Sequence, residues 1–187
     1  AMARMRGAVR DGTAVLLDAQ VSAPSTSQQA LNRWVGFAPG GPDKVHVEGL
    51  FNQPYGIPNY RVRGHLADLS VPIGFWRSVG NSYNGFFHES FVDELAHAAG
   101  ADPLEFRLAL TRDEYEPAWD CLRAVQEMSG WTGDTPEGTG RGVALCYSFG
   151  TPVAQADAAL WHEEFPNDNI IVLAETNLQL QEWLQGK

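Results

Sequence analysis

Residues 80–100 read GNSYNGFFHESFVDELAHAAG and contain the clearest periodic pattern in the chain. Apolar residues recur there at steps of three and four, which is the spacing of one face of an α-helix. Gly100 follows the last apolar residue, where a helix commonly ends. We therefore predict a helix over residues 84–99. Its buried stripe is expected to hold Phe87, Phe91, Leu95 and Ala98, with Glu89, Asp93 and His97 facing water.

The acidic stripe of this helix has two interpretations. Glu89, Asp93 and His97 repeat every four residues, so they share one face and could hold a metal. The spacing is not that of the H-E-x-x-H motif, and a solvated face of an amphipathic helix is the favoured explanation.

Two shorter helices follow in the pattern. Asp102-Pro103-Leu104-Glu105 supplies an N-cap, a first-turn proline and an acidic residue, which predicts a helix to about Thr111. A third helix is expected from Pro117 towards Gly130. These helices form an insert between β regions.

The rest of the chain is mainly of β character. Alternating or apolar runs bounded by turn residues predict strands. They are a hairpin over residues 1–22 turning at Asp11-Gly12, and strands at 44–50, 60–66, 142–147 and 169–173. Residues 22–42 are expected to form a surface excursion and residues 133–142 a linker, because both are rich in turn residues. A capping box at Thr176-Asn177-Leu178-Gln179 predicts a last short helix. The fold class expected is α+β, a mixed sheet with a helical hairpin packed against it.

Charge and composition exclude some classes of function. The 187 residues include 13 Lys plus Arg and 23 Asp plus Glu, a formal charge of -10, so there is no basic field to attract nucleic acid. No apolar run approaches the roughly 20 residues of a membrane span. Cys121 and Cys146 lack the paired spacing of zinc or redox motifs.

The stretch before the long helix is the best candidate for chemistry. Residues 71–82 read VPIGFWRSVGNS, with two glycines, two aromatics and an arginine. Glycines let a ligand approach the backbone, a helix N-terminus offers N–H donors, and arginine offers a planar fork. These features favour an anion or cofactor loop. The alternative is a strand-to-helix turn whose Phe75 and Trp76 pack in the core.

Several blocks resemble one enzyme family in the same order. They resemble the isoquinoline 1-oxidoreductase type of large subunit in the xanthine dehydrogenase and aldehyde oxidase family of molybdenum hydroxylases, which is bacterial. The blocks cover about residues 45–155 and are Pro54-Tyr55-Gly56-Ile57-Pro58-Asn59, Gly74-Phe75-Trp76-Arg77-Ser78-Val79-Gly80, Phe86, Glu89-Ser90-Phe91-Val92-Asp93-Glu94-Leu95-Ala96, Asp102-Pro103-Leu104-Glu105-Phe106-Arg107, Gly140-Arg141-Gly142-Val143-Ala144, Ser148-Phe149-Gly150 and Val153-Ala154-Gln155.

The resemblance implies a cofactor and its contacts. It implies a molybdenum-pterin cofactor of the molybdopterin cytosine dinucleotide type, held by loops without a His or Cys metal site. Arg77 is the residue that this resemblance places beside molybdenum and substrate, as a catalytic residue. The cofactor-binding residues it implies are Gly74, Phe75, Trp76, Ser78, Val79, Gly80, Ser148, Phe149 and Gly150. Ser78 and Val79 stand where the wider family has a glycine and an aromatic, so purine-type substrate contacts are not carried over.

The resemblance also implies a reaction and a partner. The parent activity is hydroxylation of an N-heterocycle or an aldehyde with water-derived oxygen, and electrons leave through an iron–sulfur small subunit. The family's base is a glutamate in a Gly-Glu loop, and none occurs in these residues. Glu175 lacks flanking glycines and is expected to be a solvated strand end.

Two hypotheses remain from the sequence. In the first, residues 1–155 are a fragment of a molybdopterin-binding domain and residues 156–187 are unassigned, with Trp161-His162-Glu163-Glu164 expected as an acidic surface helix. In the second, the chain is a non-catalytic α+β binding or assembly module derived from that family. Neither the substrate nor the compartment follows from these residues.

Overall fold

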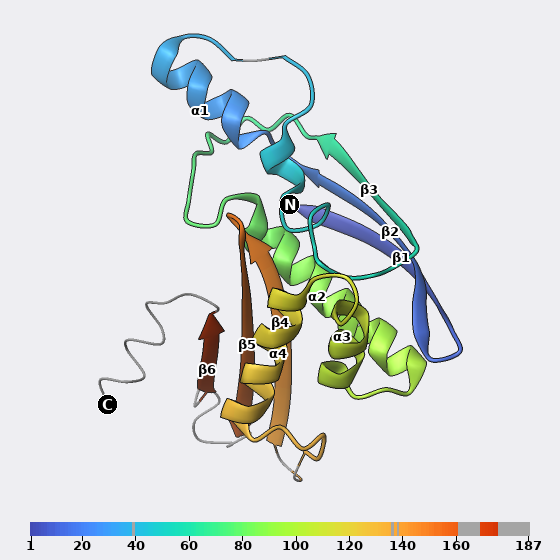
Figure 1. Ribbon diagram of the computed structural model, residues 1–187. Helices are drawn as coiled ribbons and strands as arrows, with labels where there is room; N and C mark the ends of the chain where they lie inside the picture. The colour runs from blue at the N-terminus through green and yellow to red at the C-terminus, as the bar shows by residue number, and fades with distance from the viewer. Residues whose placement is uncertain (39, 136, 138, 161–168, 176–187) are drawn as a thin grey trace.

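The computed structural model describes residues 1–38, 40–135, 137, 139–160 and 169–175 (Figure 1). The predicted helix at residues 176–179, the side chain of Glu175 and residues 161–164 lie outside the described part. Its elements, in chain order, are β1 (Met2–Arg10), β2 (Thr13–Ala23), α1 (Thr26–Val35), the 3-10 helix η1 (Lys44–Val47), β3 (Asn59–Leu66), α2 (Gly80–Ala99), α3 (Pro103–Thr111), α4 (Glu116–Ser129), β4 (Thr139–Ser148), β5 (Thr151–Leu160) and β6 (Asn169–Glu175).

The described strands form two separate three-stranded sheets. In the first, β1 and β2 are an antiparallel hairpin, and β3 lies parallel to β2 after the crossover through α1 and η1. Asp11 and Gly12 turn the hairpin with φ values of 51° and 76°, as a two-residue turn of this kind requires. The second sheet is antiparallel throughout, in the order β4-β5-β6.

The α+β class is confirmed, but the expectation of one mixed sheet is wrong, because only the β1-β2-β3 sheet is mixed. The reason lies at the free edge of β4. The carboxylate of Glu89 accepts from the N–H of Leu145 over 2.7 Å, and the side chain of Gln53 accepts from the N–H of Tyr147 over 3.0 Å. The side chains of Glu89 and Gln53 thus bind the edge N–H groups of β4 with which a strand of the first sheet would otherwise pair.

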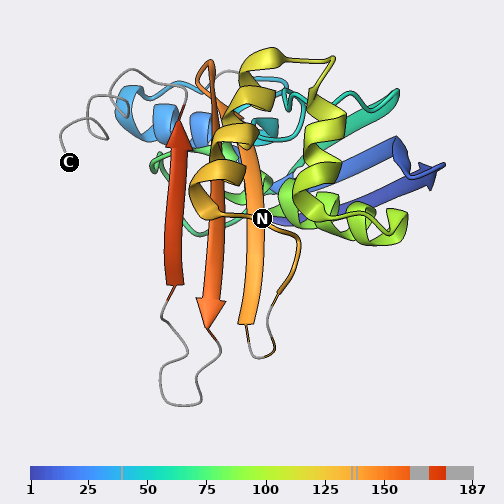
Figure 2. The same ribbon diagram turned by 60° about the horizontal axis from the view of Figure 1, so that its bottom comes forward.

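Helix α2 joins the two sheets. It packs on β1 and β2 on one side and on β4 and α3 on the other, while α4 covers β5 (Figures 1 and 2). None of the described helices is both long and apolar enough to cross a membrane.

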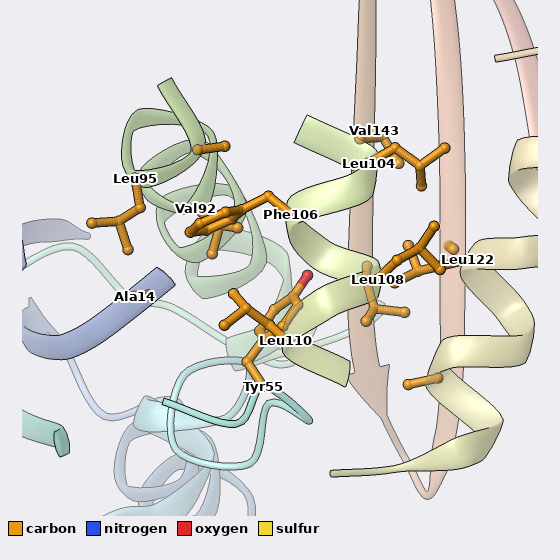
Figure 3. Close-up of a cluster of buried hydrophobic side chains, with 14 of the residues drawn as sticks. Ala14, Tyr55, Val92, Leu95, Leu104, Phe106, Leu108, Leu110, Leu122 and Val143 are labelled. Carbon is orange, nitrogen blue, oxygen red and sulfur yellow. The ribbon is translucent and has the colours of Figure 1, made fainter. Parts of the chain in front are cut away.

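The hydrophobic core lies where the helices meet the sheets. In Figure 3, Leu104 and Leu108 of α3 point toward Leu122 of α4 and Val143 of β4, whereas Phe106 and Leu110 point toward the α2 side. Alternate residues of α3 therefore pack in opposite directions, which fixes α3 between α2 and the second sheet.

Helices α3 and α4 begin and end within a residue of the predicted positions, whereas α2 begins at Gly80, four residues before the predicted start. Asp102 caps α3 by accepting from Leu104 N over 2.9 Å and Glu105 N over 3.0 Å. Gly100 and Gly130 follow α2 and α4 in the left-handed conformation that favours glycine.

Two segments differ from the prediction. The excursion expected over residues 22–42 contains α1, whose N-cap Ser25 accepts from Gln28 N over 3.0 Å. The strand expected over residues 44–50 is instead η1 followed by a turn, because Asp43 caps η1 and Gly49 has a φ of 85°. A left-handed residue cannot continue a strand.

The prediction of which residues form the buried stripe of α2 is partly wrong. Leu95 is buried and Phe87 and Phe91 are half-buried, but Ala98 is exposed. His97 is exposed as expected. Glu89 was expected to face water, but it is buried and lies between α2 and the second sheet.

Candidate functional site

A cavity of about 880 Å³ opens between α2 and the second sheet. Its lining includes residues of two loops that are far apart in the sequence, Arg77 and Ser78 before α2 and Ser148 and Phe149 after β4. The remaining lining residues are Asn81, Ser82, Gly85, Phe86, Glu89, Ser90, Asp93, Gly142, Val143, Ala144, Cys146, Val153 and Gln155.

The first loop reaches the cavity in an unusual conformation. Ser78 and Val79 have φ values of 68° and 45°, in the left-handed region that residues other than glycine avoid. Ser82 Oγ donates to the carbonyl of Arg77 over 2.9 Å and so ties the loop to the first turn of α2. This fold of the backbone presents Arg77 and Ser78 to the cavity.

Gly80 has a packing role at the start of α2. A Cβ there would lie 1.9 Å from the carbonyl oxygen of Val45, which no side chain can accommodate. Gly80 therefore lets α2 approach the backbone of η1, and it does not line the cavity.

The aromatic residues of the first loop are not part of the core. Phe75 and Trp76 are 42% and 84% exposed, so the interpretation of these two rings as core residues is wrong. Phe75 lies beside Trp34 of α1, with ring centroids 5.7 Å apart. Ile73 N donates to Gln29 Oε1 over 2.9 Å, and Arg33 donates to the carbonyl of Ile73, so α1 anchors this part of the loop. Gly74, Phe75, Trp76 and Val79 do not line the cavity.

The second loop is the tight turn of the β4–β5 hairpin. Phe149 and Gly150 have φ values of 50° and 83°, the pair of left-handed residues that such a turn needs. The turn leaves Phe149 exposed, and Phe149 and Ser148 line the cavity while Gly150 does not.

Arg77 carries a charge that is available at this cavity. Its side chain is exposed, and no carboxylate among the described residues lies within ion-pair distance of its guanidinium. An arginine in this state can bind an anionic or carbonyl oxygen of a ligand.

Asn81 was not identified from the sequence. Its side chain is 6% exposed and lines the cavity, and its Oδ1 lies 3.7 Å from the thiol Sγ of Cys146. Its amide nitrogen donates to no other described residue. Its position within the candidate stretch, residues 71–82, was the signal that the sequence offered.

Glu89 lines the cavity, and its carboxylate accepts hydrogen bonds from several donors. Its carboxylate accepts from Arg107 Nε over 2.9 Å, from Leu145 N over 2.7 Å and from the Tyr55 hydroxyl over 3.1 Å, and His88 Nδ1 lies 3.0 Å away. Burial alone would raise the pKa of Glu89, but Arg107, His88 and the Leu145 N–H favour the charged form and hold that pKa below its ordinary value.

Arg107 explains why two of the resembling blocks contain acidic residues and an arginine. Its Nη1 donates to Asp93 over 2.7 Å and to the carbonyl of Pro103 over 3.0 Å, and its Nη2 donates to the carbonyl of Glu89 over 3.0 Å. Glu89 and Asp93 are four residues apart on α2, so both reach one arginine on α3. Glu89 and Asp93 of the stripe therefore belong to an ion network between helices, whereas His97 is exposed.

The described residues contain no group of three or more His, Cys, Asp or Glu placed to hold a metal ion. Burial and the nearby Glu89 raise the pKa of the Cys146 thiol to about 11, which disfavours the thiolate form.

The cavity suits a polar small-molecule ligand. Its volume falls within the range of small-molecule sites. One wall offers the cation of Arg77 and the polar side chains of Ser78 and Asn81, and the other offers aliphatic and aromatic surface from Val143, Val153 and Phe149.

Several known proteins are similar in sequence to this chain. The chain is 34% identical over 109 residues to the beta subunit of isoquinoline 1-oxidoreductase from Brevundimonas diminuta, covering 58% of this chain and 14% of that protein. It is 33% identical over 128 residues to the B subunit of nicotinate dehydrogenase from Pseudomonas putida, covering 65% and 10% respectively. It is 30% identical over 160 residues to PaoC, the molybdenum-binding subunit of an aldehyde oxidoreductase from Escherichia coli O157:H7, covering 74% and 21%.

These matches confirm the resemblance to large subunits of molybdenum-dependent oxidoreductases of the isoquinoline 1-oxidoreductase type. The chain spans between a tenth and about a fifth of the length of these three curated relatives. No family model matches it.

Proposed function

We propose that this chain forms one wall of the site that holds a molybdenum-pterin cofactor, because it is related to part of the molybdenum-binding subunits of bacterial oxidoreductases. The observation that carries the proposal is the shared cavity. Two loops that resemble cofactor loops, at residues 77–78 and 148–149, line the same space although about 70 residues separate them.

Within the proposal, each loop has a distinct task. Arg77 faces the ligand as a cation and is the catalytic residue, because it lies at the mouth of the cavity without a carboxylate partner among the described residues. Ser78, Ser148 and Phe149 contact the cofactor, with the hydroxyls as hydrogen-bond partners and the ring as an apolar face.

The other residues assigned to the cofactor act indirectly. Gly80 sets the approach of α2 to η1, and Gly150 completes the turn that exposes Phe149. Gly74, Phe75, Trp76 and Val79 lie outside the cavity wall and shape the loop around Arg77. This division refines the set of cofactor residues expected from the sequence.

Glu89 holds the cavity floor as a fixed negative charge and is a positioning residue. Four donors already surround its carboxylate, so it has little capacity to accept a proton from a substrate. The molybdenum-pterin group supplies the redox chemistry when bound. The residues of this chain bind and orient it.

The finer features of the function rest on the resemblance. We propose a cofactor of the molybdopterin cytosine dinucleotide type, hydroxylation of an N-heterocycle or an aldehyde with water-derived oxygen, and an iron–sulfur small subunit as the electron-accepting partner. The two cysteines of this chain are too few to bind an iron–sulfur cluster, which normally needs four thiolates.

The alternative is a non-catalytic α+β binding or assembly module. The observation that favours it is the structural role of the charges between the helices, since Glu89, Asp93 and Arg107 bind one another and would be kept for packing alone. The open cavity and the unpaired charge of Arg77 favour the cofactor site, because a scaffold needs neither.

The experiment is to purify the protein, as its gene encodes it, from cells that make the molybdenum-pterin cofactor, and to measure molybdenum and pterin per chain. The cofactor hypothesis predicts that both are present, and that Arg77→Lys keeps the pterin while it lowers substrate turnover, because an ammonium cannot form the planar fork. A protein that is folded and carries neither molybdenum nor pterin supports the module instead.

A further inference from the structure

Strand β1 forms an open edge of the first sheet, on the side beside α2 (Figure 1). The sheet order is β1-β2-β3, so β2 pairs with one side of β1 and no described strand pairs with the other. The register with β2 is regular from Met2 to Ala8, and a shift follows between Ala8 and Val9. Residues 2–8 therefore present backbone N–H and C=O groups that can pair with one more extended strand.

The outer face of this edge has two arginines without a carboxylate partner in the described ranges. Arg4 and Arg6 are exposed, and the half-buried residues of β1 alternate with them. Arg6 lies opposite Asp18 of β2 in the register. The Asp18 carboxylate, however, accepts from Arg61 over 2.7 Å and from Arg63 over 2.9 Å, both on β3. Arg4 and Arg6 therefore carry positive charge that a ligand at the edge can pair with.

The inner side of the same edge is an apolar groove of about 260 Å³ between β1 and α2. Its lining comes from Ala3 and Met5 of β1 and from one face of α2, and no described residue of β2 takes part. On that face Phe86 is 70% exposed and Phe91 is half-buried. Glu94 also lines the groove, so an apolar side chain is better placed there than an acidic one.

The alternation around β1 fits one kind of partner. Successive side chains of a strand point to opposite faces of its sheet, so a strand paired with β1 would place every second side chain beside the two arginines. The side chains between them would lie over the groove. Carboxylates suit the first set of positions, and apolar groups suit the second.

A second copy of this chain does not fit the same edge. Pairing of β1 with β1 across a two-fold axis would bring Arg4 and Arg6 of both copies together, and like charges opposite each other destabilise a sheet. The two arginines therefore select against self-association at this edge and in favour of an acidic partner.

We propose that the edge of β1 binds an extended, acidic segment of another polypeptide as an added strand. Acidic side chains at alternate positions of the segment pair with Arg4 and Arg6, and apolar side chains between them fill the groove on α2. The whole chain has a formal charge of -10, so its remaining surface repels an acidic segment while this edge attracts it. The proposal concerns a different face from the cofactor cavity and stands or falls independently of the proposed function.

The test is a titration of the purified 187-residue chain into a fluorescein-labelled, end-capped peptide of alternating valine and glutamate, followed by fluorescence anisotropy. The peptide has about seven residues, the length of the regular part of β1. Two control ligands are a peptide of the same composition, with its valines and glutamates in two blocks, and oligothymidylate. We expect the alternating peptide to bind more tightly than either control, because only an alternating strand meets both faces of the edge.

A matched pair of double variants locates the charge that the peptide uses. Arg4→Gln with Arg6→Gln removes the cations of the edge, whereas Arg112→Gln with Arg123→Gln removes the same charge from exposed positions at the end of α3 and on α4. Affinity for the alternating peptide should fall about fivefold or more in the first variant and stay within about twofold of the wild type in the second.

Amide hydrogen exchange on the wild-type chain is the second measurement, and it does not depend on how well a variant folds. The alternating peptide should slow exchange of backbone amides within residues 2–8 and leave α4 unchanged, because an added strand pairs with the β1 edge alone.

Four results would overturn the proposal. They are absence of binding by the alternating peptide, equal binding of the blocked peptide or oligothymidylate, equal affinities of the two double variants, and unchanged exchange in residues 2–8. The first three leave at most a basic patch. A dimer of the chain alone that protects residues 2–8 would make a second copy the occupant and would overturn it as well.

Discussion

Glu89 of α2 and Arg107 of α3 form a buried ion pair, with Arg107 Nε 2.9 Å from Glu89 Oε2 and the arginine side chain fully enclosed. The pair joins α2 and α3, and through the Leu145 N–H it also joins α2 to β4. One carboxylate therefore connects α2, α3 and β4. Removal of the Glu89 carboxylate would leave the charged guanidinium of Arg107 buried, without water and with too few hydrogen-bond acceptors.

The first prediction concerns this pair. Glu89→Leu should lower the free energy of unfolding by about 3–5 kcal/mol, because it leaves Arg107 buried and only partly paired. Glu94→Leu is the matched control, since Glu94 is exposed on the same helix and its loss should change stability little. Chemical denaturation of both variants measures the difference, and equal midpoints would show that the pair does not stabilise the fold.

The second prediction concerns acid stability. The pKa of Glu89 is lower in the folded protein than in the unfolded chain, so the unfolded state binds the proton first as pH falls. The stabilisation by Glu89 is thus complete above the unfolded pKa of about 4.3 and is lost as pH falls through the folded pKa. Glu89→Gln should flatten the dependence of unfolding free energy on pH below this value. Unfolding curves at a series of pH values test it, and parallel profiles for variant and wild type would contradict it.

The third prediction concerns Gly80. Gly80→Ala should destabilise the protein strongly, because the new Cβ would lie 1.9 Å from the carbonyl oxygen of Val45. Gly142→Ala is the control, since a Cβ at that cavity-lining glycine meets nothing within 4 Å. Thermal unfolding compares the two. Any loss of cofactor in Gly80 variants then follows from the displacement of α2, and a stable Gly80→Ala protein would remove that explanation.

The fourth prediction concerns Ser78. Ser78→Gly should raise stability by up to about 1 kcal/mol, because glycine adopts the φ of 68° found there without the steric cost that a side chain brings. The unfolding free energy measures the gain. A clear loss of stability would mean that the Ser78 side chain makes a contact worth more than the strain.

The fifth prediction revises the cost of truncating Phe91. The sequence pattern makes Phe91 a fully buried core residue, for which truncation costs about 3–5 kcal/mol. The ring is half-buried and packs beside Gly7 of β1, so Phe91→Ala should cost less, about 1–3 kcal/mol. Denaturation midpoints decide between these values, and no change at all would show that α2 does not pack on β1 through this ring.

The regular elements could be predicted from the sequence because their signals are local. The Asp11-Gly12 turn, the Asp102 cap and the glycines after α2 and α4 act within a few residues. Helix α1 was missed because the surrounding serines, prolines and glycines suggested a loop, although Ser25 and Gln28 have the spacing of a cap.

The arrangement of the site could be predicted only in part. The resemblance identified both loops that meet at the cavity, whereas periodicity placed Glu89 in water because four-residue spacing does not reveal which face meets a partner. The decisive partner, Arg107, lies 18 residues away and on another helix. The role of Gly80 likewise depends on Val45, whose segment was expected to be a strand.

The central claim is that the cavity between the two loops holds the molybdenum-pterin cofactor, and filling the cavity tests it most directly. Gly142→Trp places a large ring at a cavity-lining position of β4 where a Cβ meets nothing, and Gly140→Trp makes the same change two residues away, outside the lining. Molybdenum and pterin per chain should be measured in both variants purified from cofactor-making cells. The account predicts that Gly142→Trp loses molybdenum and pterin together while Gly140→Trp retains them. Full molybdenum and pterin in a folded Gly142→Trp protein would contradict the account.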